Sequence, residues 1–371
     1  AKKFIDQTPD QVIVDEPKYY EALETLINPD TFENFKSWLL VKTLISVSTL
    51  LDDDTRVIAG TYSRALSGSK EAMKAQKAAF YLHMVEKMID VYKNRLASND
   101  WLSDDTHQKA IVKLNTLGIN VGYPDKLDPL YTKFVVDEDA DLVTNDLNFT
   151  QISLKEHYGH WGKDVDRSRW EMPAHMVNAY YNPSFNIIVF PAAILQAPFY
   201  SLDQSSSENF GGIGAVIAHE ISHAFDNNGA QFDEFGNLHN WWTDEDLKHF
   251  QGLAQDMIAE FDGLETEAGK VNGKLVVSEN IADAGGLSCA LEAAKSEPDV
   301  DLKAFFINWA RIWRMKSSIE RQKLLLSIDV HAPHVLRANV QPKNLADFYT
   351  TFGITSDDKM YLAPEKRVNI W

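Results

Sequence analysis

The sequence predicts a mainly α-helical fold with a small mixed β-sheet, arranged in two lobes. Apolar residues recur at spacings of three and four over most of the chain, which is the helical period, whereas short strand-like runs are confined to its middle. The 371 residues, of which 44% are hydrophobic, are enough to bury a core of this size. We expect a helical lobe at 1–121 and a second lobe at 122–371, because the helical spacing gives way to Gly and Pro at position 122.

The first lobe is expected to consist of helices. Helical spacing runs through 29–66 and again through 72–96, and Ser103 is a candidate N-cap for a helix that reaches Leu117. From position 122 to Trp170 the sequence changes to short alternating segments and aromatic-rich stretches, so loops are expected there.

The second lobe is expected to combine a β-hairpin with amphipathic helices. Two apolar segments, 177–181 and 187–190, flank a turn sequence and predict the hairpin. The spacing of Ser205 and Glu208 predicts a capping box before a helix over 214–225. Further helices are predicted over 244–261, 277–295 and 302–325.

Charge, hydropathy and cysteine content exclude several classes of protein. The net charge of −18 and the lack of a basic run argue against a nucleic-acid partner. The most apolar stretch, 38–51, is too short for a membrane span and contains Lys42, so we expect no membrane partner. A single cysteine, Cys289, allows no intrachain disulfide, and there is no apolar signal segment, so we expect a soluble, cytoplasmic protein.

A candidate metal site lies in the predicted helix over 214–225. His219 and His223 are four apart, so both imidazoles lie on one helix face and can reach one cation, while Glu220 can hold a water molecule on it. Zinc suits this set because it accepts nitrogen and oxygen ligands tetrahedrally and leaves a position open to water in catalytic sites. The alternative is a pair of core histidines with satisfied hydrogen bonds.

A third protein ligand must come from another segment. A histidine six residues after His223, or a glutamate nineteen residues after it, would complete two known arrangements, but Gly229 and Trp242 occupy those positions. Glu279 is the best remaining candidate, because it lies four residues before Asp283 on the predicted helix over 277–295.

The carboxylates of this second helix suggest a division of roles. One of Glu279 and Asp283 can bind the metal while the other accepts the free ring N–H of a ligand histidine. A solvated acidic helix face is the alternative for this pair. Asp226, three residues after His223, is a weaker candidate for the second role and could equally cap the end of its helix.

Five sequence blocks, in the same order, resemble the neprilysin family of zinc endopeptidases, most closely its bacterial endopeptidase O members. The resemblance is strong from about Gly122 to the end and looser across the first third. It implies a gluzincin-type catalytic domain, whose third zinc ligand is a glutamate, a helical lobe, and one Zn²⁺ per chain. The blocks are Val-Asn-Ala-Tyr-Tyr at 177–181, His-Glu-Ile-Ser-His at 219–223, Glu-Asn-Ile-Ala-Asp-Ala-Gly-Gly at 279–286, Asp-Val-His-Ala-Pro-His-Val-Leu-Arg at 329–337, and Pro-Glu-Lys-Arg-Val-Asn-Ile-Trp at 364–371.

The resemblance also implies a role for each candidate residue. It makes His219, His223 and Glu279 the zinc ligands, Glu220 the general base, Asp283 the partner that orients a zinc histidine, and His331 the group that stabilises the tetrahedral intermediate. Asn178, Ala179 and Arg337 would hold the main chain of the substrate. From the residues alone, His334 is as good a candidate as His331 for stabilising the intermediate. The alternative for Asn178 is that it only shapes the hairpin.

The predicted function is that of a zinc metalloendopeptidase. By the resemblance it would hydrolyse short oligopeptides on the amino side of hydrophobic residues, with Glu220 accepting a proton from zinc-bound water. The alternative is a zinc-binding structural or binding fragment that is inactive without a missing N-terminal part. The sequence does not indicate the oligomeric state.

The chain departs from the family in its N-terminal part. Full members are much longer, and most of their N-terminal helical part is absent here. Around His83 and Met84 the sequence passes abruptly from one familiar helical segment to another. We therefore expect these two residues not to be bonded neighbours.

Overall fold

The computed structural model describes residues 78–124 and 128–371, which belong to two compact units. One unit contains 128–165, and the other combines 78–124 with 166–371. The compact units thus divide the chain differently from the predicted boundary at 121/122. The helical pattern over 29–66, the start of that over 72–96 and the apolar stretch 38–51 lie outside the described residues.

The unit at 128–165 contains a helix that the sequence analysis missed. After a short 3₁₀ turn, η2 (Pro129–Lys133), the helix α6 spans Leu142–Gly159, so the expectation of loops is wrong here. Its N-cap, Asp141, accepts a 2.7 Å hydrogen bond from the Thr144 amide. Apolar side chains such as Leu147 are exposed. Because α6 has no buried apolar stripe, the helical spacing that marks other helices is weak.

The larger unit begins with two helices, α4 (Ala78–Ser98) and α5 (Asp104–Asn115). The predicted cap of α5 is confirmed, because the Ser103 hydroxyl accepts from the Thr106 amide. The helix α4 continues through 83 and 84 without a break, so the expected interruption between these residues is not seen.

A small mixed sheet follows, as predicted. Its strand order is β1 (Gly118–Gly122), β3 (Ile187–Pro191), β2 (Tyr180–Asn182), with β1 parallel and β2 antiparallel to β3. The strand β3 is central and buried along its length, whereas β2 lies at one edge. The predicted hairpin is confirmed, but β2 starts three residues later than expected, so Asn178 and Ala179 precede it.

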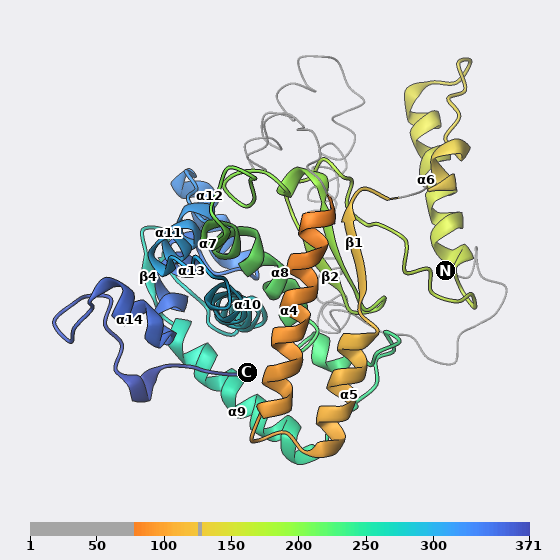
Figure 1. Ribbon diagram of the computed structural model, residues 1–371. Coiled ribbons are helices and arrows are strands. Elements are labelled where there is room, and N and C mark those ends of the chain that lie inside the picture. Colours follow the sequence, from red (N-terminus) through yellow and green to blue (C-terminus); the bar gives the residue numbers. More distant parts are fainter. Residues whose placement is uncertain (1–77, 125–127) are drawn as a thin grey trace, which may run out of the picture. The chain divides into compact units, whose positions relative to one another are not determined.

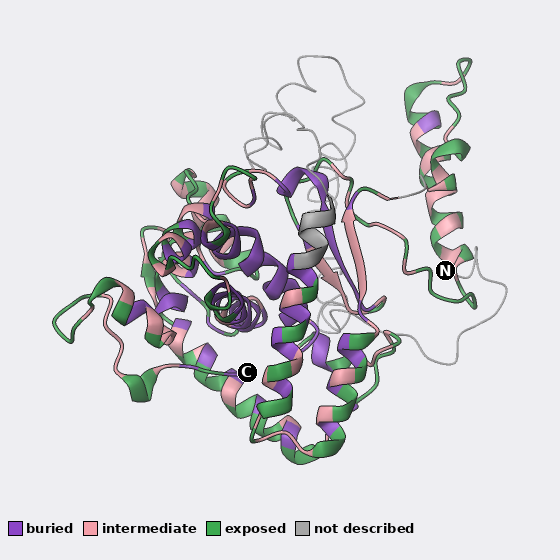
Figure 2. Ribbon diagram, viewed as in Figure 1, coloured by how far each residue is buried: buried purple, intermediate pink, exposed green. Residues whose placement is uncertain are grey.

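Two buried helices form the centre of the larger unit. The capping box of Ser205 and Glu208 is confirmed and starts a helical run of α7 (Ser206–Asn209), a π-helical turn η4 (Phe210–Gly214) and α8 (Ala215–Ser222). The helix α8 packs along α10 (Val277–Lys295) (Figure 1). Both are buried over most of their length (Figure 2).

Glycine lets these two helices approach closely. A Cβ atom on Gly286 would lie 2.7 Å from the carbonyl oxygen of Ala215 and 2.8 Å from the amide nitrogen of His219. These distances are shorter than van der Waals contact, so only glycine fits here without a shift of backbone. The close approach brings the first turns of α10 beside the histidines of α8.

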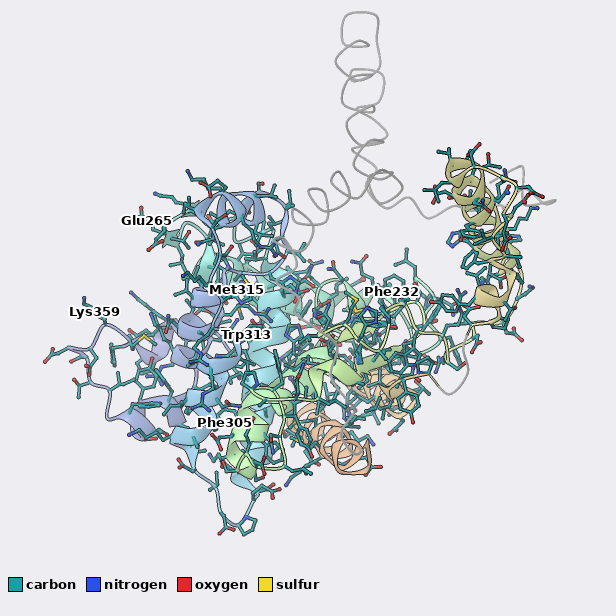
Figure 3. The ribbon with its side chains drawn as sticks, turned by 90° about the horizontal axis from the view of Figure 1, so that it is seen from above. Phe232, Glu265, Phe305, Trp313, Met315 and Lys359 are labelled. Atoms are coloured by element: carbon teal, nitrogen blue, oxygen red, sulfur yellow. The ribbon has the colours of Figure 1, made fainter. Side chains whose placement is uncertain are left out.

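The remaining elements surround this pair. The predicted helix over 244–261 is confirmed as α9 (Asp244–Phe261), but the predicted helix over 302–325 is wrong as a single element. It is divided into α11 (Leu302–Ile312) and α12 (Ile319–Ile328), because Ser318 caps a new helix by accepting from the Arg321 amide. Figure 3 follows this segment from Phe305 in α11 through Trp313 to Met315. The other short elements are η3 (Ala192–Ile194), η5 (Gly229–Gln231), β4 (Glu265–Thr266), β5 (Gly269–Lys270), α13 (His334–Val340), η6 (Gln341–Asn344), α14 (Ala346–Phe352) and η7 (Pro364–Lys366).

Two further features of the described residues bear on the sequence analysis. No helix within 78–124 or 128–371 is both long and apolar enough to cross a membrane. Cys289 is a free, buried thiol on α10.

Candidate metal centre

Three side chains converge at the contact between α8 and α10. His219 lies near the end of α8, His223 is its C-cap, and Glu279 lies in the first turn of α10. The two Nε2 atoms are 3.0 Å apart, and the Glu279 Oε2 atom lies 3.2 Å from that of His219 and 3.5 Å from that of His223. Two ligand atoms at 2.0–2.1 Å from a tetrahedral zinc would lie about 3.3 Å apart. The three donors therefore have the spacing of one face of a zinc tetrahedron.

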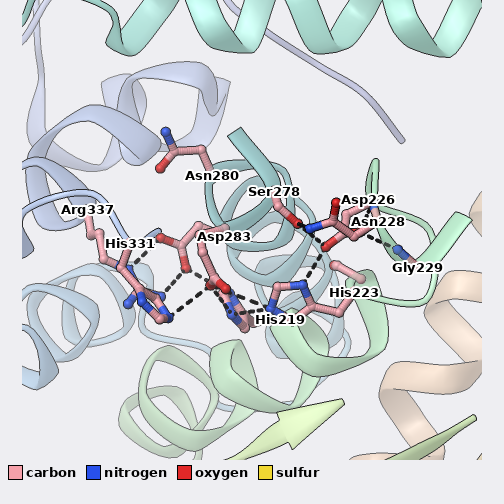
Figure 4. A network of polar contacts seen from close by, with 12 residues as sticks. His219, His223, Asp226, Asn228, Gly229, Ser278, Asn280, Asp283, His331 and Arg337 are labelled. Atoms are coloured by element: carbon pink, nitrogen blue, oxygen red, sulfur yellow. Dashed lines mark hydrogen bonds and ion pairs between the residues drawn. The ribbon is translucent and has the colours of Figure 1, made fainter. Parts of the chain in front are cut away.

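The donor atoms themselves also fit a cation. Glu279 Oε2 is buried and accepts no hydrogen bond, although it lies within 3.5 Å of the imidazoles of His219, His223 and His331. Figure 4 shows these three histidines together with Asp283. An ionised carboxylate in such a place needs a positive partner. The carboxylate of Glu220 also lies within 4.8 Å of the ring nitrogens of both α8 histidines. Two imidazoles and a carboxylate are the ligand types that zinc accepts.

The other ring nitrogen of each histidine is held by a carboxylate. His219 Nδ1 lies 2.9 Å from Asp283 Oδ1, and His223 Nδ1 lies 2.6 Å from Asp226 Oδ2. Such contacts fix the tautomer, so that Nε2 is free of its proton and turned toward the metal. The structure thus brings both candidate partners to the site, Asp283 through the contact between α8 and α10 and Asp226 through the loop after α8.

Hydrogen bonds that the sequence analysis missed hold the Asp226 carboxylate. Its Oδ2 atom accepts from the Ser278 hydroxyl at 2.6 Å, and its Oδ1 atom accepts from the amides of Asn228 and Gly229, both at 2.7 Å. Ser278 directly precedes Glu279 on α10. The position of Ser278 beside the candidate ligand Glu279 is the one sequence signal that could have indicated its contact with Asp226.

Arg337 has a contact that the sequence analysis did not predict. Its Nε and one terminal nitrogen donate to the two oxygens of Asp283, each at 2.7 Å. The guanidinium carbon lies 3.6 Å from the centre of the Trp313 ring. Burial alone would raise the pKa of Asp283, but Arg337 and His219 outweigh it and lower that pKa to about 2. Asp283 is therefore ionised at neutral pH and can orient His219. Arg337 also lines the cleft beside the donors.

The carboxylates set the protonation of the histidines. Burial and the charge of His223 lower the pKa of His219, but the neighbouring carboxylates of Asp283 and Glu279 outweigh them and raise it. Burial likewise opposes protonation of His223, yet Glu279 and Asp226 raise its pKa well above the usual value. Burial would raise the pKa of Glu279, but these histidines lower it well below its usual range. The cluster attracts positive charge.

Glu220 lies at the floor of a cleft of about 630 Å³. The residue is buried on α8, and burial raises the pKa of its carboxyl above the usual value. A carboxylate with a raised pKa accepts a proton more readily at neutral pH, which is what a general base requires.

His331 and His334 are distinguished by the structure. His331 Nε2 lies 3.1 Å from Glu279 Oε2, and its Nδ1 lies 2.8 Å from Asp329 Oδ1. His334 instead packs its ring edge-on against Trp313 at 5.8 Å. Only His331 of these two faces the donor set.

The cleft also brings the predicted substrate-binding residues together. Asn178 and Ala179 line it on the side of β2, and Asn178 is exposed. The apolar lining of the cleft includes Phe199, Ile194, Ile312 and Trp313. Other aromatic residues of this unit lie elsewhere: Phe190 and Phe210 are in the core, and Trp241 and Trp242 belong to a buried aromatic cluster with Trp371.

The fold and the donor set together define a class: metallopeptidases in which a helix with two histidines faces a second helix that supplies a glutamate. Comparison with known proteins identifies the family. The model of peptidase family M13 matches residues 178–368, and its N-terminal model matches 1–81 and 70–124. The chain belongs to peptidase family M13, which confirms the resemblance described above.

Individual relatives agree with this assignment. The chain is 50% identical over 397 residues to the neutral endopeptidase of Lactococcus lactis subsp. lactis, covering 100% of this chain and 63% of that protein. The crystal structure of PEPO from Lactobacillus rhamnosis superposes with a TM-score of 0.84 at 43% identity over 95% of this chain and 60% of that one. The Mycobacterium tuberculosis zinc metalloprotease ZMP1, solved with an inhibitor, superposes with a TM-score of 0.81 at 32% identity over 96% and 60%. The chain thus spans less than two thirds of the length of these relatives.

Proposed function

We propose that the protein is a zinc metalloendopeptidase that binds one Zn²⁺ per chain. The observation that carries the proposal is the triangle of His219 Nε2, His223 Nε2 and Glu279 Oε2, with edges of 3.0, 3.2 and 3.5 Å, beside Glu220 in an open cleft. A purely structural zinc site is closed by a fourth protein ligand, whereas a catalytic one is open to water and substrate. The open cleft supports the catalytic interpretation.

The proposed reaction divides the chemistry between the metal and the chain. Zinc, when bound, supplies a Lewis acid that polarises the scissile carbonyl and acidifies water. Glu220 accepts the proton of the attacking water and delivers it to the leaving amine. His331, whose Nε2 atom lies beside Glu279, donates a hydrogen bond to the oxyanion that develops. Asp283 and Asp226 keep the imidazoles of His219 and His223 in the tautomer that binds metal.

The walls of the cleft support a peptide substrate. The strand β2 lies at the edge of its sheet, so an extended peptide can add beside it through main-chain hydrogen bonds, and Asn178 and Ala179 line the cleft just before that strand. Phe199 and Trp313 line the same cleft and suit an apolar side chain of the substrate. We therefore propose hydrolysis of oligopeptides that carry hydrophobic residues, with cleavage on the amino side of those residues, which is the preference that the family resemblance implies. A cytoplasmic location stays a prediction from the sequence.

Hydrolysis of an oligopeptide by the full chain, with and without a chelator, tests the proposal. The chelator should abolish turnover and added Zn²⁺ should restore it. Glu220→Gln should lower kcat by about 100- to 10,000-fold and still bind zinc, because the amide cannot accept a proton. The exposed Glu265→Gln serves as a matched control and should keep wild-type turnover. Zinc binding without hydrolysis in the wild-type chain would instead favour the alternative of a zinc-binding fragment.

A further inference from the structure

A lysine lies on the buried face of α5, where an apolar residue is expected. The buried residues of this helix are Thr106, Ala110, Lys113 and Leu114, and Lys113 is only 1% exposed. Lysine is almost never fully buried unless its charge has partners. The contacts of its ammonium group must therefore explain its position.

The hydrogen bonds of this ammonium group all go to the segment that follows α8. Lys113 Nζ donates to the carbonyl oxygens of Ala224, Gly229 and Phe232, at 2.8, 2.7 and 2.7 Å. An ammonium group has three N–H donors, so these bonds use all of them. Nζ also lies 5.8 Å from the centre of the Phe225 ring and 5.6 Å from that of Trp241. No carboxylate of the described residues forms an ion pair with it.

Burying this charge is costly, which makes the three bonds informative. Burial lowers the pKa of Lys113 to about 7, opposed by the more distant carboxylates of Asp226, Asp233 and Glu234. A methionine would fill the same space without that cost. What lysine adds is that its ammonium group binds three carbonyl groups of one loop, at residues 224, 229 and 232.

The tied loop contains the carboxylate that orients His223. Asp226 lies between the carbonyls of Ala224 and Gly229, and its Oδ2 atom is 2.6 Å from His223 Nδ1. Its Oδ1 atom accepts from the Gly229 amide, so Gly229 is bound on both sides, by Asp226 and by Lys113. A Cβ atom on Gly229 would lie 1.7 Å from the His223 carbonyl oxygen, so the loop folds back tightly on the end of α8.

We propose that Lys113 is a positioning residue of the metal centre, which holds the 224–232 loop so that Asp226 stays aligned with His223. The proposal rests on the zinc site proposed above. Loss of the lysine should loosen Asp226, and loss of a carboxylate that holds a ligand histidine typically costs ten- to a hundredfold in metal affinity.

Zinc affinity of the full chain, measured by competition with a chelator, tests this role. Lys113→Met, which keeps the length and removes the donors, should weaken zinc binding about ten- to a hundredfold. Lys113→Arg, which keeps a charged donor, should recover part of that loss. The matched control is Lys109→Met, one turn earlier on α5. Lys109 is an exposed residue, and its Nζ donates a 3.3 Å hydrogen bond to the Trp241 carbonyl. It should bind zinc within about twofold of wild type.

Two measurements separate positioning from a general loss of stability. The first is a double-mutant cycle of Lys113→Met with Asp226→Asn. Because both substitutions act on the orientation of His223, the fold-loss of zinc affinity in the double variant should be smaller than the product of the two single fold-losses. The absorption spectrum of the Co²⁺-loaded protein should change in Lys113→Met and not in Lys109→Met.

Several outcomes would overturn the proposal. One is a folded Lys113→Met with wild-type zinc affinity and an unchanged Co²⁺ spectrum, even if its unfolding midpoint in urea falls. Should that variant not fold, Lys113→Gln, which can donate two of the three bonds, is measured in the same way and decides by the same criteria. A wild-type chain that binds no zinc would refute the proposed function itself, whereas zinc binding that is equal in wild type and Lys113→Met would refute only the role of Lys113.

Discussion

The two walls of the cleft are built in different ways. The first, which we propose binds the metal and call the metal-binding wall, consists of α8 and α10. There His219 is 7% exposed and Asp283 only 1%, and carboxylates hold the imidazoles of both proposed ligand histidines. The second, which we call the loop wall, consists of the lining residues outside these helices, on loops and beside a sheet edge: the His331 side chain is 42% exposed and Asn178 is exposed.

This difference indicates which side chains must already be in position before substrate binds. Metal ligands must already be in place, because a misplaced donor weakens binding directly, so they lie on buried helices. Groups that contact substrate lie on loops carried by a rigid scaffold, which is the common arrangement of binding residues. If the comparison is correct, changes on one wall should affect zinc affinity, and changes on the other should affect turnover alone.

The largest effect is expected from pH on the metal-binding wall. The carboxylates raise the pKa values of both His219 and His223, so the metal-free protein keeps those protons to a higher pH than an ordinary histidine does. Zinc must displace them, so its affinity is full above the raised pKa values and falls as pH drops through them, by up to about a hundredfold per pH unit when two protons are released. Zinc titrations from pH 9 to pH 5 measure this slope. Tighter binding at pH 5 than at pH 7 would contradict the assignment of both ligands.

The next largest effect is expected from His331→Ala on the loop wall. Loss of one oxyanion donor should lower kcat by about 100- to 1,000-fold. Zinc affinity should stay within a few-fold of wild type, because the three donors are still present. His334→Ala, three residues further on and packed against Trp313, is the matched control and should keep most of the turnover. A loss of zinc affinity in His331→Ala equal to its loss of turnover would break the comparison.

Asp283→Asn should have the opposite pattern. The amide removes the charge that orients His219 and leaves Arg337 without its carboxylate, so zinc affinity should fall about ten- to a hundredfold. Glu292→Gln, on the same helix and paired at the surface with Arg95, should leave zinc affinity unchanged. Competition with a chelator measures both, and equal affinities in the two variants would contradict the role of Asp283.

The smallest effect is expected from Asn178→Ala. One or two hydrogen bonds to substrate are lost, each worth about 0.5–1.5 kcal/mol, so kcat/KM should fall about 2- to 10-fold, mainly through KM. Initial-rate kinetics on an oligopeptide give both constants. An unchanged KM would return Asn178 to its alternative role of shaping the hairpin.

The metal-binding wall could be predicted from the sequence because its signals are local. His219 and His223, and likewise Glu279 and Asp283, are each four apart in a helix, so spacing alone places each pair on one face. The helices over 244–261 and 277–295 were predicted with their observed bounds. The substrate-side residues came from the family resemblance, not from spacing.

The missed features depend on contacts between distant segments or on the lack of them. Asp283 and Arg337 are 54 residues apart, and no local pattern pairs them. Lys113 was not considered in the sequence analysis, although a lysine on an otherwise buried stripe is a visible signal. The helix α6 has few buried neighbours, so the periodicity that burial imposes on sequence is weak there.

The segments before position 125 have a consequence for how the chain can be cut. Residues 78–124 match the N-terminal model of the family, yet α4 and α5 pack in the same compact unit as the metal-binding helices. The Tyr92 hydroxyl contacts Ser222 and the Ala218 carbonyl, and Lys113 holds the loop beyond α8. A recombinant fragment that starts at residue 178, where the match to the catalytic model begins, would expose the apolar flanks of α8 and α10 to water. The border drawn by sequence alignment is therefore not a border for autonomous folding.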